Sequence, residues 1–347
     1  MRAAIVEAPG KLLVREVPEP VPGPYEALCR LIYGATCTGT DQHILRGRFP
    51  WPVDYPTVLG HESVGRVERV GERVRHLRPG DLITRVGTPP SGGASATWGG
   101  FAEWGLARDH RAMREDGLPE REWSPHRINE IVPPDLAAAD ATMMITWRET
   151  LSYLQRVGVG PGASVLVVGS GGNGLAFAAH AANGGAGRIA LVGSAGRERA
   201  ARAVGATHFA DYRGPDPAAA TGLGLPGGYD VVIDAVGRRD SLDPFLPCVR
   251  DGGAVAVYGV DDWGGVTIRP QRARGSFVWS SRGYDEPEAH DAVVGLMRAG
   301  RLRAAPWFEG AGPFALEEIA SAFEAVRERR CVKALIRLAP DAAAPGG

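Results

Sequence analysis

The stretch "ASVLVVGSGGNGLAFAAHAANGG", Ala163–Gly185, decides the fold of this 347-residue chain. Its apolar run Val165–Val168 predicts a buried strand, and the small residues after the glycines predict a helix. The glycines between them have G-x-G-x-x-G spacing, which in a strand–turn–helix context is typical of a dinucleotide site. The first makes the tight turn, the second lets backbone approach a pyrophosphate, and the third allows the helix to pack on the strand. The predicted contacts are Gly169, Gly171, Gly172, Asn173 and Gly174. Because the chain has 48 glycines, a turn of purely structural use is the alternative.

Around this stretch the chain divides into two kinds of pattern. From Thr142 onward, apolar runs such as "RIALVGS" and "YDVVIDAVG" alternate with helical segments, which predicts a parallel sheet with βαβ crossovers. Before Asp140, short apolar runs broken by Gly and Pro predict an antiparallel, barrel-like β domain. A late apolar run, "CVKALIRLA", is expected to return to the first domain. We therefore expect an α/β protein with one domain over 1–141 and 308–347 and a dinucleotide-binding domain over 142–307.

Composition narrows the class of protein. The 39 basic and 40 acidic residues give a net charge of −1. The chain therefore lacks the excess of basic residues that is typical of proteins that bind nucleic acid or an anionic membrane. No run of about 18 apolar residues occurs, so no transmembrane helix is expected. The N-terminus "MRAAIVEAPGKLLVREV" alternates like a strand and unlike a signal peptide, and a cytoplasmic location is the resulting expectation. The four cysteines contain no C-x-x-C pair, so a metal site would need mixed ligands.

The end of the second predicted strand of the parallel sheet discriminates between the two nicotinamide cofactors. NAD usually needs a carboxylate there for the ribose 2′-OH. Here "RIALV" is followed by Gly193 and Ser194, and the next charged residue is Arg197. A cation attracts a 2′-phosphate, so the sequence favours NADP, with NAD possible. In the alternative, Arg197 and Arg199 are ordinary surface charges of the next helix.

Several motifs in one order point to a family. They are "GTDQH" (Gly39–His43), "GHESVGRVERVG" (Gly60–Gly71), "RPGD" (Arg78–Asp81), "GGFAEW" (Gly99–Trp104) and "GSGGNG". With them the chain resembles the medium-chain, zinc-type alcohol/polyol dehydrogenase superfamily over essentially its whole length. The resemblance implies a GroES-like β-barrel domain followed by a Rossmann domain, and a nicotinamide-dependent alcohol dehydrogenase.

The resemblance also assigns roles to residues. In the family, a zinc ion held by a Cys, the His of G-H-E and a third ligand polarises the substrate oxygen. His61 matches that histidine, and Glu62 matches the adjacent carboxylate, which ligates directly or exchanges with water. Thr40 matches the residue that bonds the substrate hydroxyl, and His43 matches the relay that carries its proton to solvent. Asp41 resembles a structural partner of the site.

The cysteine position departs from the family pattern. The usual pattern is C-G-[ST]-D, but here Thr38 stands three residues before the aspartate and Cys37 lies one residue earlier. Either a one-residue bulge brings Cys37 to the metal, or Thr38 occupies the ligand position and the site holds little or no zinc. A neutral hydroxyl is a poor zinc ligand compared with a thiolate. Because the other residues of the family's site are present, we favour Cys37 as the metal ligand. In the alternative, Cys37 is only a small buried apolar residue.

Further ligands are few. The position where the family can place another Cys or Glu falls near Ile145, which cannot ligate, and Glu149 lies one helical turn later. Thr150 fits a family threonine beside the nicotinamide. The family's structural zinc needs four closely spaced cysteines, but "LITRVGTPPSGGASATW", Leu82–Trp98, contains none. The expectation is therefore one catalytic zinc and no structural zinc, with Cys37, His61 and Glu62 as ligands.

Three functions remain as hypotheses. The first is a zinc-dependent NAD(P) dehydrogenase of a secondary alcohol, polyol, sugar or cyclitol-like, with Trp51, Trp98 and Trp147 as candidates to line the cleft or as core residues. The second is a metal-free NADPH reductase of an activated double bond or quinone, and the third a non-catalytic NADPH-binding protein. The expected partners are a small alcohol or ketone and a second copy of the chain in a homodimer or homotetramer, with residues 252–281 as a candidate sheet-edge contact. The charged segment 108–130 reads as a solvated surface insertion or as a loop at the substrate entrance.

Overall fold

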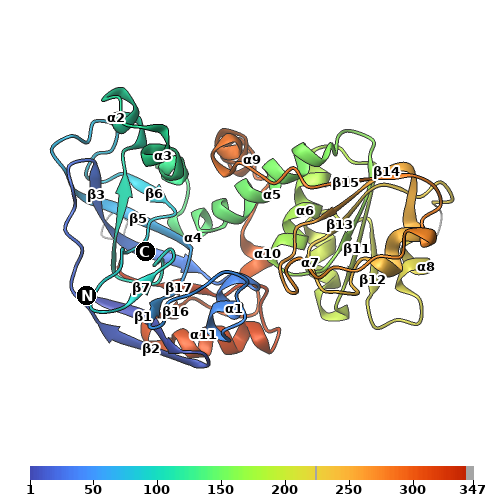
Figure 1. The fold of residues 1–347 in the computed structure, drawn as a ribbon, viewed down its shortest axis with the longest axis horizontal. Coiled ribbons are helices and arrows are strands. Elements are labelled where there is room, and N and C mark those ends of the chain that lie inside the picture. Colours follow the sequence, from blue (N-terminus) through green and yellow to red (C-terminus); the bar gives the residue numbers. More distant parts are fainter. Residues whose placement is uncertain (223–224, 341–347) are drawn as a thin grey trace. The chain divides into compact units, whose positions relative to one another are not determined.

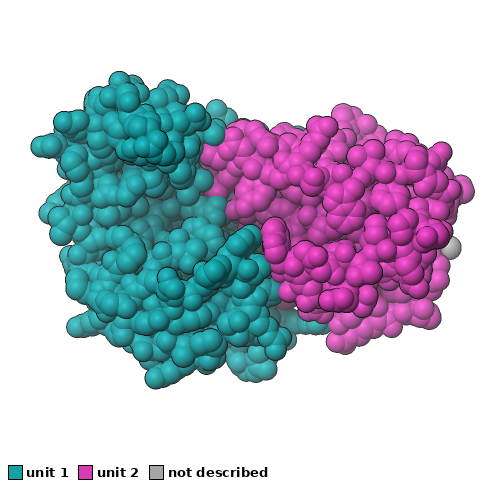
Figure 2. Space-filling model, viewed as in Figure 1, with its two compact units in different colours: residues 1–145, 290–347 teal, residues 146–289 magenta. Residues whose placement is uncertain are grey.

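The computed structural model describes residues 1–222 and 225–340 and contains two compact units. Unit 1 comprises Met1–Ile145 and His290–Gly347, and unit 2 comprises Thr146–Ala289 (Figure 2). The sequence analysis placed the return to the first domain at residue 308, whereas the first unit resumes at His290. Each unit has its own sheet system and is described separately.

Unit 1 is built on two mostly antiparallel sheets (Figure 1). The larger sheet has the order β16-β17-β3-β5-β6-β9, with β8 also paired to β3, and the smaller has the order β2-β1-β4-β7. Buried residues of both sheets, among them Ile5 and Leu31, share one hydrophobic core with Phe101 from the segment between β7 and β8. The strands are β1 (Arg2–Ala8), β2 (Lys11–Glu16), β3 (Glu26–Ala35), β4 (Thr57–Val58), β5 (Glu62–Val70), β6 (Leu82–Thr84), β7 (Ser95–Ala96), β8 (Trp104–Arg108), β9 (Ile131–Val132), β16 (Phe314–Ala315) and β17 (Leu335–Arg337).

The helices of unit 1 are short. Helix α11 packs on the barrel core through Ile319, Phe323 and Val326. Two polar contacts join α9 to other residues of unit 1: His290 Nε2 lies 3.2 Å from the Ile131 carbonyl oxygen, and Arg298 binds Asp135 at 2.8 Å. The bounds are α1 (Thr40–Leu45), α2 (His110–Glu115), α3 (Glu120–Trp123), η1 (Ser124–Ile128), α4 (Ala138–Ala141), α9 (His290–Arg298), α10 (Ala305–Phe308), η6 (Leu316–Glu318) and α11 (Ile319–Arg327).

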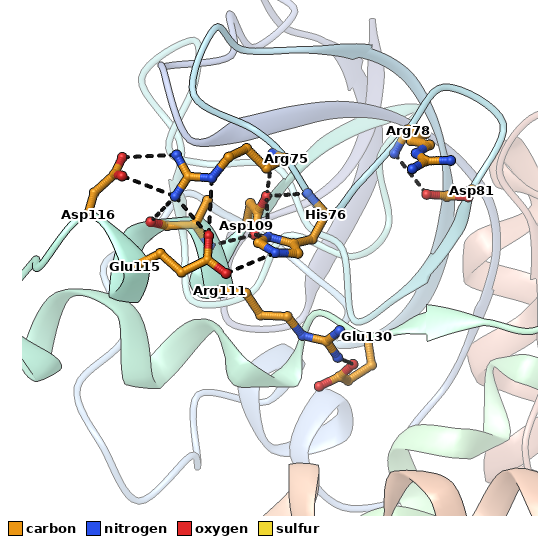
Figure 3. Close-up of polar contacts among 10 residues, drawn as sticks. Arg75, His76, Arg78, Asp81, Asp109, Arg111, Glu115, Asp116 and Glu130 are labelled. Atoms are coloured by element: carbon orange, nitrogen blue, oxygen red, sulfur yellow. Dashed lines mark hydrogen bonds and ion pairs between the residues drawn. The ribbon is translucent and has the colours of Figure 1, made fainter.

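The charged segment 108–130 is folded against the barrel rather than extended. The Asp109 carboxylate caps α2 by accepting from the Ala112 N–H, and it also accepts from the backbone N–H groups of Arg75 and His76 (Figure 3). Burial opposes the charge of Asp109, but these hydrogen bonds outweigh it and lower the pKa of Asp109. The Arg75 guanidinium then bonds both Glu115 and Asp116 at the end of α2. A network of charges therefore fastens this insertion to the turn before β6.

Unit 2 is a six-stranded sheet of order β12-β11-β10-β13-β14-β15 in which every neighbouring pair is parallel. This confirms the expected α/β class with a doubly wound parallel sheet. Helices α6 and α8 pack on its strands (Figure 1). The bounds are α5 (Met143–Val157), which crosses from unit 1, β10 (Ser164–Val168), α6 (Gly172–Asn183), β11 (Arg188–Gly193), η2 (Ala195–Arg197), α7 (Glu198–Ala203), β12 (His208–Asp211), α8 (Pro217–Gly222), β13 (Tyr229–Asp234), η3 (Asp243–Cys248), β14 (Val249–Val257), η4 (Pro270–Arg272), β15 (Phe277–Ser280) and η5 (Glu286–Ala289).

The glycine turn lies between β10 and α6, as the sequence predicts. Gly169 has φ +115°, a conformation that favours glycine, and α6 begins at Gly172 with Gly171 as its N-cap. A Cβ on Gly174 would lie 1.9 Å from the Gly169 carbonyl oxygen, so only glycine lets the helix approach the turn this closely.

Within the described part of the chain, no helix combines the length and the apolar character needed to cross a membrane.

Candidate active site

The register of the larger sheet in unit 1 brings the predicted metal ligands together. Ala35 at the end of β3 pairs with Glu62 at the start of β5. Cys37 follows β3 by two residues, and His61 precedes β5 by one. One ligand atom from each of Cys37, His61 and Glu62 lies within 4.8 Å of the others, and all three residues are buried. Residues distant in sequence thus form one compact donor set at this end of the sheet.

Asp41, on α1, fixes the geometry of two members of this set. Its carboxylate is fully buried; Oδ2 accepts from the Cys37 N–H at 2.8 Å, and Oδ1 lies 3.0 Å from His61 Nδ1. Because a carboxylate only accepts, Nδ1 carries the donated proton and the lone pair is left on Nε2. Burial opposes a charge on His61, but Asp41 and Cys37 together outweigh burial and raise the pKa of His61 well above its ordinary value. Only the neutral ring can ligate through Nε2, so metal binding would displace a proton held there.

Glu62 has a second partner that the sequence analysis did not identify. The Lys333 ammonium group donates to both carboxylate oxygens of Glu62, at 2.6 Å to Oε1, and Glu62 Oε1 lies 3.8 Å from His61 Nε2. Burial would lower the pKa of Lys333, but the Glu62 carboxylate outweighs burial and raises it. The carboxylate therefore faces a cation on one side and the histidine on the other.

The remaining residues predicted for the alcohol site lie on or beside α1. Thr40 begins this helix, and the His43 N–H donates to the Gly39 carbonyl oxygen at 2.9 Å. Thr38, the competing candidate for the ligand position, is half-exposed, whereas Cys37 is buried. In unit 2, the Glu149 carboxylate accepts from the Tyr258 hydroxyl at 3.0 Å.

An aromatic group adjoins the histidine. The ring centroid of Trp98 lies 5.2 Å from that of His61, and Phe49 lies 6.1 Å from Trp98 and 5.0 Å from Trp51. Trp51 is 47 % exposed. The third candidate, Trp147, is fully buried in unit 2 and is therefore a core residue.

The cofactor residues predicted from the sequence lie at the ends of the adjacent strands β10 and β11 in unit 2, except Thr150, which lies on α5. Ser194 follows β11, and its N–H donates to the Ser170 hydroxyl of the glycine turn at 3.2 Å. Arg197 ends the short η2 that follows. Tyr212, directly after β12, donates its N–H to the Gly193 carbonyl oxygen at 2.9 Å. Thr150 is fully buried, and its hydroxyl donates to the Thr146 carbonyl oxygen at 2.6 Å.

The donor set fits zinc. A thiol, an imidazole nitrogen with its tautomer fixed and a carboxylate are ligands that catalytic zinc sites use, usually three to a site. Asp41 supplies the outer hydrogen bond that such a histidine normally makes. Among the described residues, Cys37, His61 and Glu62 are the one group of three His, Cys, Asp or Glu side chains whose ligand atoms lie this close together.

Comparison with known proteins decides the family. The profile of the "Alcohol dehydrogenase GroES-like domain" matches residues 23–118, and that of "Zinc-binding dehydrogenase" matches residues 172–294. The NADP-dependent isopropanol dehydrogenase of Thermoanaerobacter brockii is 30% identical over 318 residues, which are 85% of this chain and 83% of that protein. The chain belongs to the medium-chain, zinc-type alcohol dehydrogenase superfamily. It is an NAD(P)-dependent dehydrogenase of that superfamily.

Two further similarities place this dehydrogenase within the superfamily. Sorbitol dehydrogenase of Ovis aries is 30% identical over 264 residues, which are 74% of each chain. The solved structure of a zinc-binding dehydrogenase from Sinorhizobium meliloti 1021, bound to NADP, has a TM-score of 0.77 and 25% identity, covering 97% of this chain and 98% of that one. The expected GroES-like and Rossmann architecture is thereby confirmed.

Two elements of the dehydrogenase's candidate sites were missed from the sequence. Lys333 is the one charged residue in the buried run "CVKALI", and a lone lysine within an apolar run is a signal for a buried partner. Tyr212 and Arg213 follow the strand next to β11, and the Arg213 guanidinium lies 5.2 Å from the Tyr212 ring centroid. The signal for that pair is the parallel pairing of Gly193 with Asp211, which needs the sheet order to be known.

Proposed function

We propose that this dehydrogenase transfers hydride between a secondary alcohol and NADP, with one zinc ion held by Cys37, His61 and Glu62. The observation that carries the proposal is the buried donor set with its Asp41 support. A zinc ion bound there would act as a Lewis acid on the substrate oxygen and lower the pKa of the alcohol. The alternative, a metal-free reductase, would have no use for a thiol, an imidazole and a carboxylate gathered at one point.

The protein's own groups prepare and move the proton. Asp41 holds the His61 imidazole in the tautomer that presents Nε2 to the donor set. In the proposal, the Thr40 hydroxyl accepts the proton of the substrate alcohol and passes it toward His43. The two residues lie three positions apart on α1, a spacing that places side chains on the same helix face.

The substrate proposed is a polyol, sugar or cyclitol-like secondary alcohol. Its support is the aromatic group of Trp98, Phe49 and Trp51 beside His61, because aromatic faces pack against the C–H groups of such rings. Three relatives are named as dehydrogenases of alcohols, which agrees with an alcohol substrate: sorbitol dehydrogenase, D-arabinitol dehydrogenase and isopropanol dehydrogenase. A panel of polyols, cyclitols and simple secondary alcohols, each followed by NADPH absorbance, tests this substrate class.

NADP is proposed over NAD because β11 is followed by a hydroxyl and a cation where NAD enzymes place a carboxylate. Ser194 is held beside the glycine turn by its bond to Ser170, and Arg197 follows within one helical turn. Guanidinium groups form strong charge-assisted hydrogen bonds with phosphate. Thr150 beside the nicotinamide stays a prediction, since its hydroxyl is used within α5.

We also propose a homodimer or homotetramer, located in the cytoplasm. The edge strand β15 carries Val278 and Trp279, which are 61 % and 44 % exposed. An exposed apolar sheet edge is a template for pairing with a second copy. Light scattering should give at least two copies for the wild type and a shift toward monomer for Trp279→Asp; a monomeric wild type would contradict this part.

The decisive variant for the whole proposal is His61→Ala. It should abolish turnover of the best alcohol and zinc retention together, while NADPH binding, followed by nicotinamide fluorescence, stays at the wild-type level. Full activity in this variant would end the metal hypothesis. Loss of NADPH binding as well would indicate a folding defect, which circular dichroism would reveal.

A further inference from the structure

Lys333 forms a buried ion pair with a carboxylate of the candidate metal site. Both side chains are almost fully buried, at 1 % exposure for Lys333 and 3 % for Glu62. The partners are 271 residues apart, and strand register alone brings them together. Leu335 on β17 pairs with Ala35 on β3, and Ala35 in turn pairs with Glu62 on β5. The backbone next to Lys333 is fixed as well, since the Ala334 N–H donates to the Thr36 hydroxyl at 2.9 Å.

Stability is a weak explanation for this pair. Withdrawing two charges from water costs several kcal/mol per ion, and a well-packed apolar pair of similar size is often as stable or more so. The position of the pair is more informative. The same Glu62 oxygen that accepts from Lys333 lies 3.8 Å from His61 Nε2, the nitrogen that faces the donor set. The lysine therefore acts on a prospective metal ligand.

Charge balance supports a link between the lysine and the metal. The buried group holds three potential anions, namely the Cys37 thiolate and the carboxylates of Asp41 and Glu62. One lysine cation and one divalent metal ion together balance these three anions, with His61 neutral. Without Lys333, the empty site would carry one more unbalanced negative charge in a dry environment, where such charge is expensive, so a metal cation would be attracted more strongly.

We propose that Lys333 is a positioning residue that restrains Glu62 and so keeps this third metal ligand weak and displaceable. The inference rests on the proposed function and adds the control of its metal site. Electron density that Glu62 donates to the ammonium hydrogens is not available to the metal, and both oxygens are engaged. A loosely held third ligand leaves a coordination position that a substrate oxygen can take. The proposed zinc mechanism requires that a substrate oxygen reach the metal in every turnover.

The test is the metal affinity of Lys333 variants, measured with zinc alone against a chromophoric chelator. Lys333→Met should bind zinc more tightly, by about tenfold, the lower end of what partners outside the ligand shell usually change. Turnover of the best alcohol should fall in the same variant, so affinity and activity move in opposite directions. With cobalt(II) in place of zinc, the visible d–d bands should weaken as Glu62 adds to the coordination number. Lys333→Arg keeps the ion pair and should restore the wild-type spectrum.

A double-mutant cycle separates this mechanism from simple removal of a nearby cation. Glu62→Gln takes away the carboxylate, so adding Lys333→Met to it should give no further tightening. Equal tightening with and without the carboxylate would overturn the proposal, as would weaker zinc binding in Lys333→Met. If Lys333→Met does not fold, Lys333→Gln keeps a neutral hydrogen-bond donor and should shift affinity in the same direction by a smaller factor.

The outcomes also distinguish this inference from the proposed function. A wild type that retains zinc and oxidises alcohols, with Lys333 variants unchanged in affinity and cobalt spectrum, contradicts the inference alone. A wild type that binds neither zinc nor cobalt contradicts both.

Discussion

Replacing Asp41 by Asn changes the proton on His61 without removing any metal ligand. The buried carboxylate accepts from the Cys37 N–H and from His61 Nδ1. An amide offers one acceptor and one donor group to these two donors. Either the bond to Cys37 is lost, or His61 changes tautomer and moves its proton to Nε2, where it blocks metal binding. The loss of a buried hydrogen bond to a charged group costs about 1.5–3 kcal/mol. Zinc affinity should therefore fall by about 10–100-fold.

The assay is a competition titration of zinc against a chromophoric chelator, and the protein offers a matched control. Asp109 is also a buried carboxylate that accepts backbone N–H groups and lies 3.0 Å from a histidine Nδ1, that of His76. Asp109→Asn should lower thermal stability and leave zinc affinity at the wild-type value. Wild-type zinc affinity in Asp41→Asn, or an equal loss in both variants, would refute the assigned role of Asp41.

Three further predictions concern unit 2. Arg197→Ala should weaken NADPH binding by about tenfold or more while sparing NADH, because only the 2′-phosphate needs the cation; an equal effect on both, measured by fluorescence titration, would remove the reason for preferring NADP. Burial lowers the pKa of His180 to about 3, below its unfolded value of about 6.5, so the native protein loses stability as pH falls from about 6.5 toward 3. Urea unfolding should show that His180→Leu removes about 2 kcal/mol of that loss at pH 5, and an unchanged pH dependence would contradict this. Gly174→Ala should lower both stability and NADPH affinity, since its Cβ would meet the Gly169 carbonyl oxygen, and wild-type values for both would show that the turn adapts.

Local patterns were sufficient for unit 2. The strand–turn–helix around Gly169–Gly174 and the parallel sheet follow from apolar runs and glycine spacing, which depend on neighbours in sequence. The position of His290 shows what local patterns do not predict, namely which residues a helix packs against. Helix α9 is amphipathic, so its sequence predicts a buried face but not the partner, and its contacts to Ile131 and Asp135 belong to unit 1.

The candidate metal site was predictable only in part, for a similar reason. His61 and Glu62 were found as adjacent residues in a motif. The choice between Cys37 and Thr38 depends on how the chain leaves β3, and burial of Cys37 beside the other donors supports the cysteine. Lys333 could not be placed from sequence, because its contact to Glu62 arises from the lateral order β17-β3-β5. Sequence spacing carries no information about such a register.

Zinc content per chain, on protein purified without chelators or a histidine tag, tests the central claim most directly. The account predicts about one zinc per chain for the wild type and almost none for Cys37→Ser, with Thr38→Ala retaining the metal. No zinc in the wild type, even after soaking, would contradict the proposed donor set and leave His61 and Glu62 without the assigned role. About two zinc ions per chain would contradict the expectation of a single site.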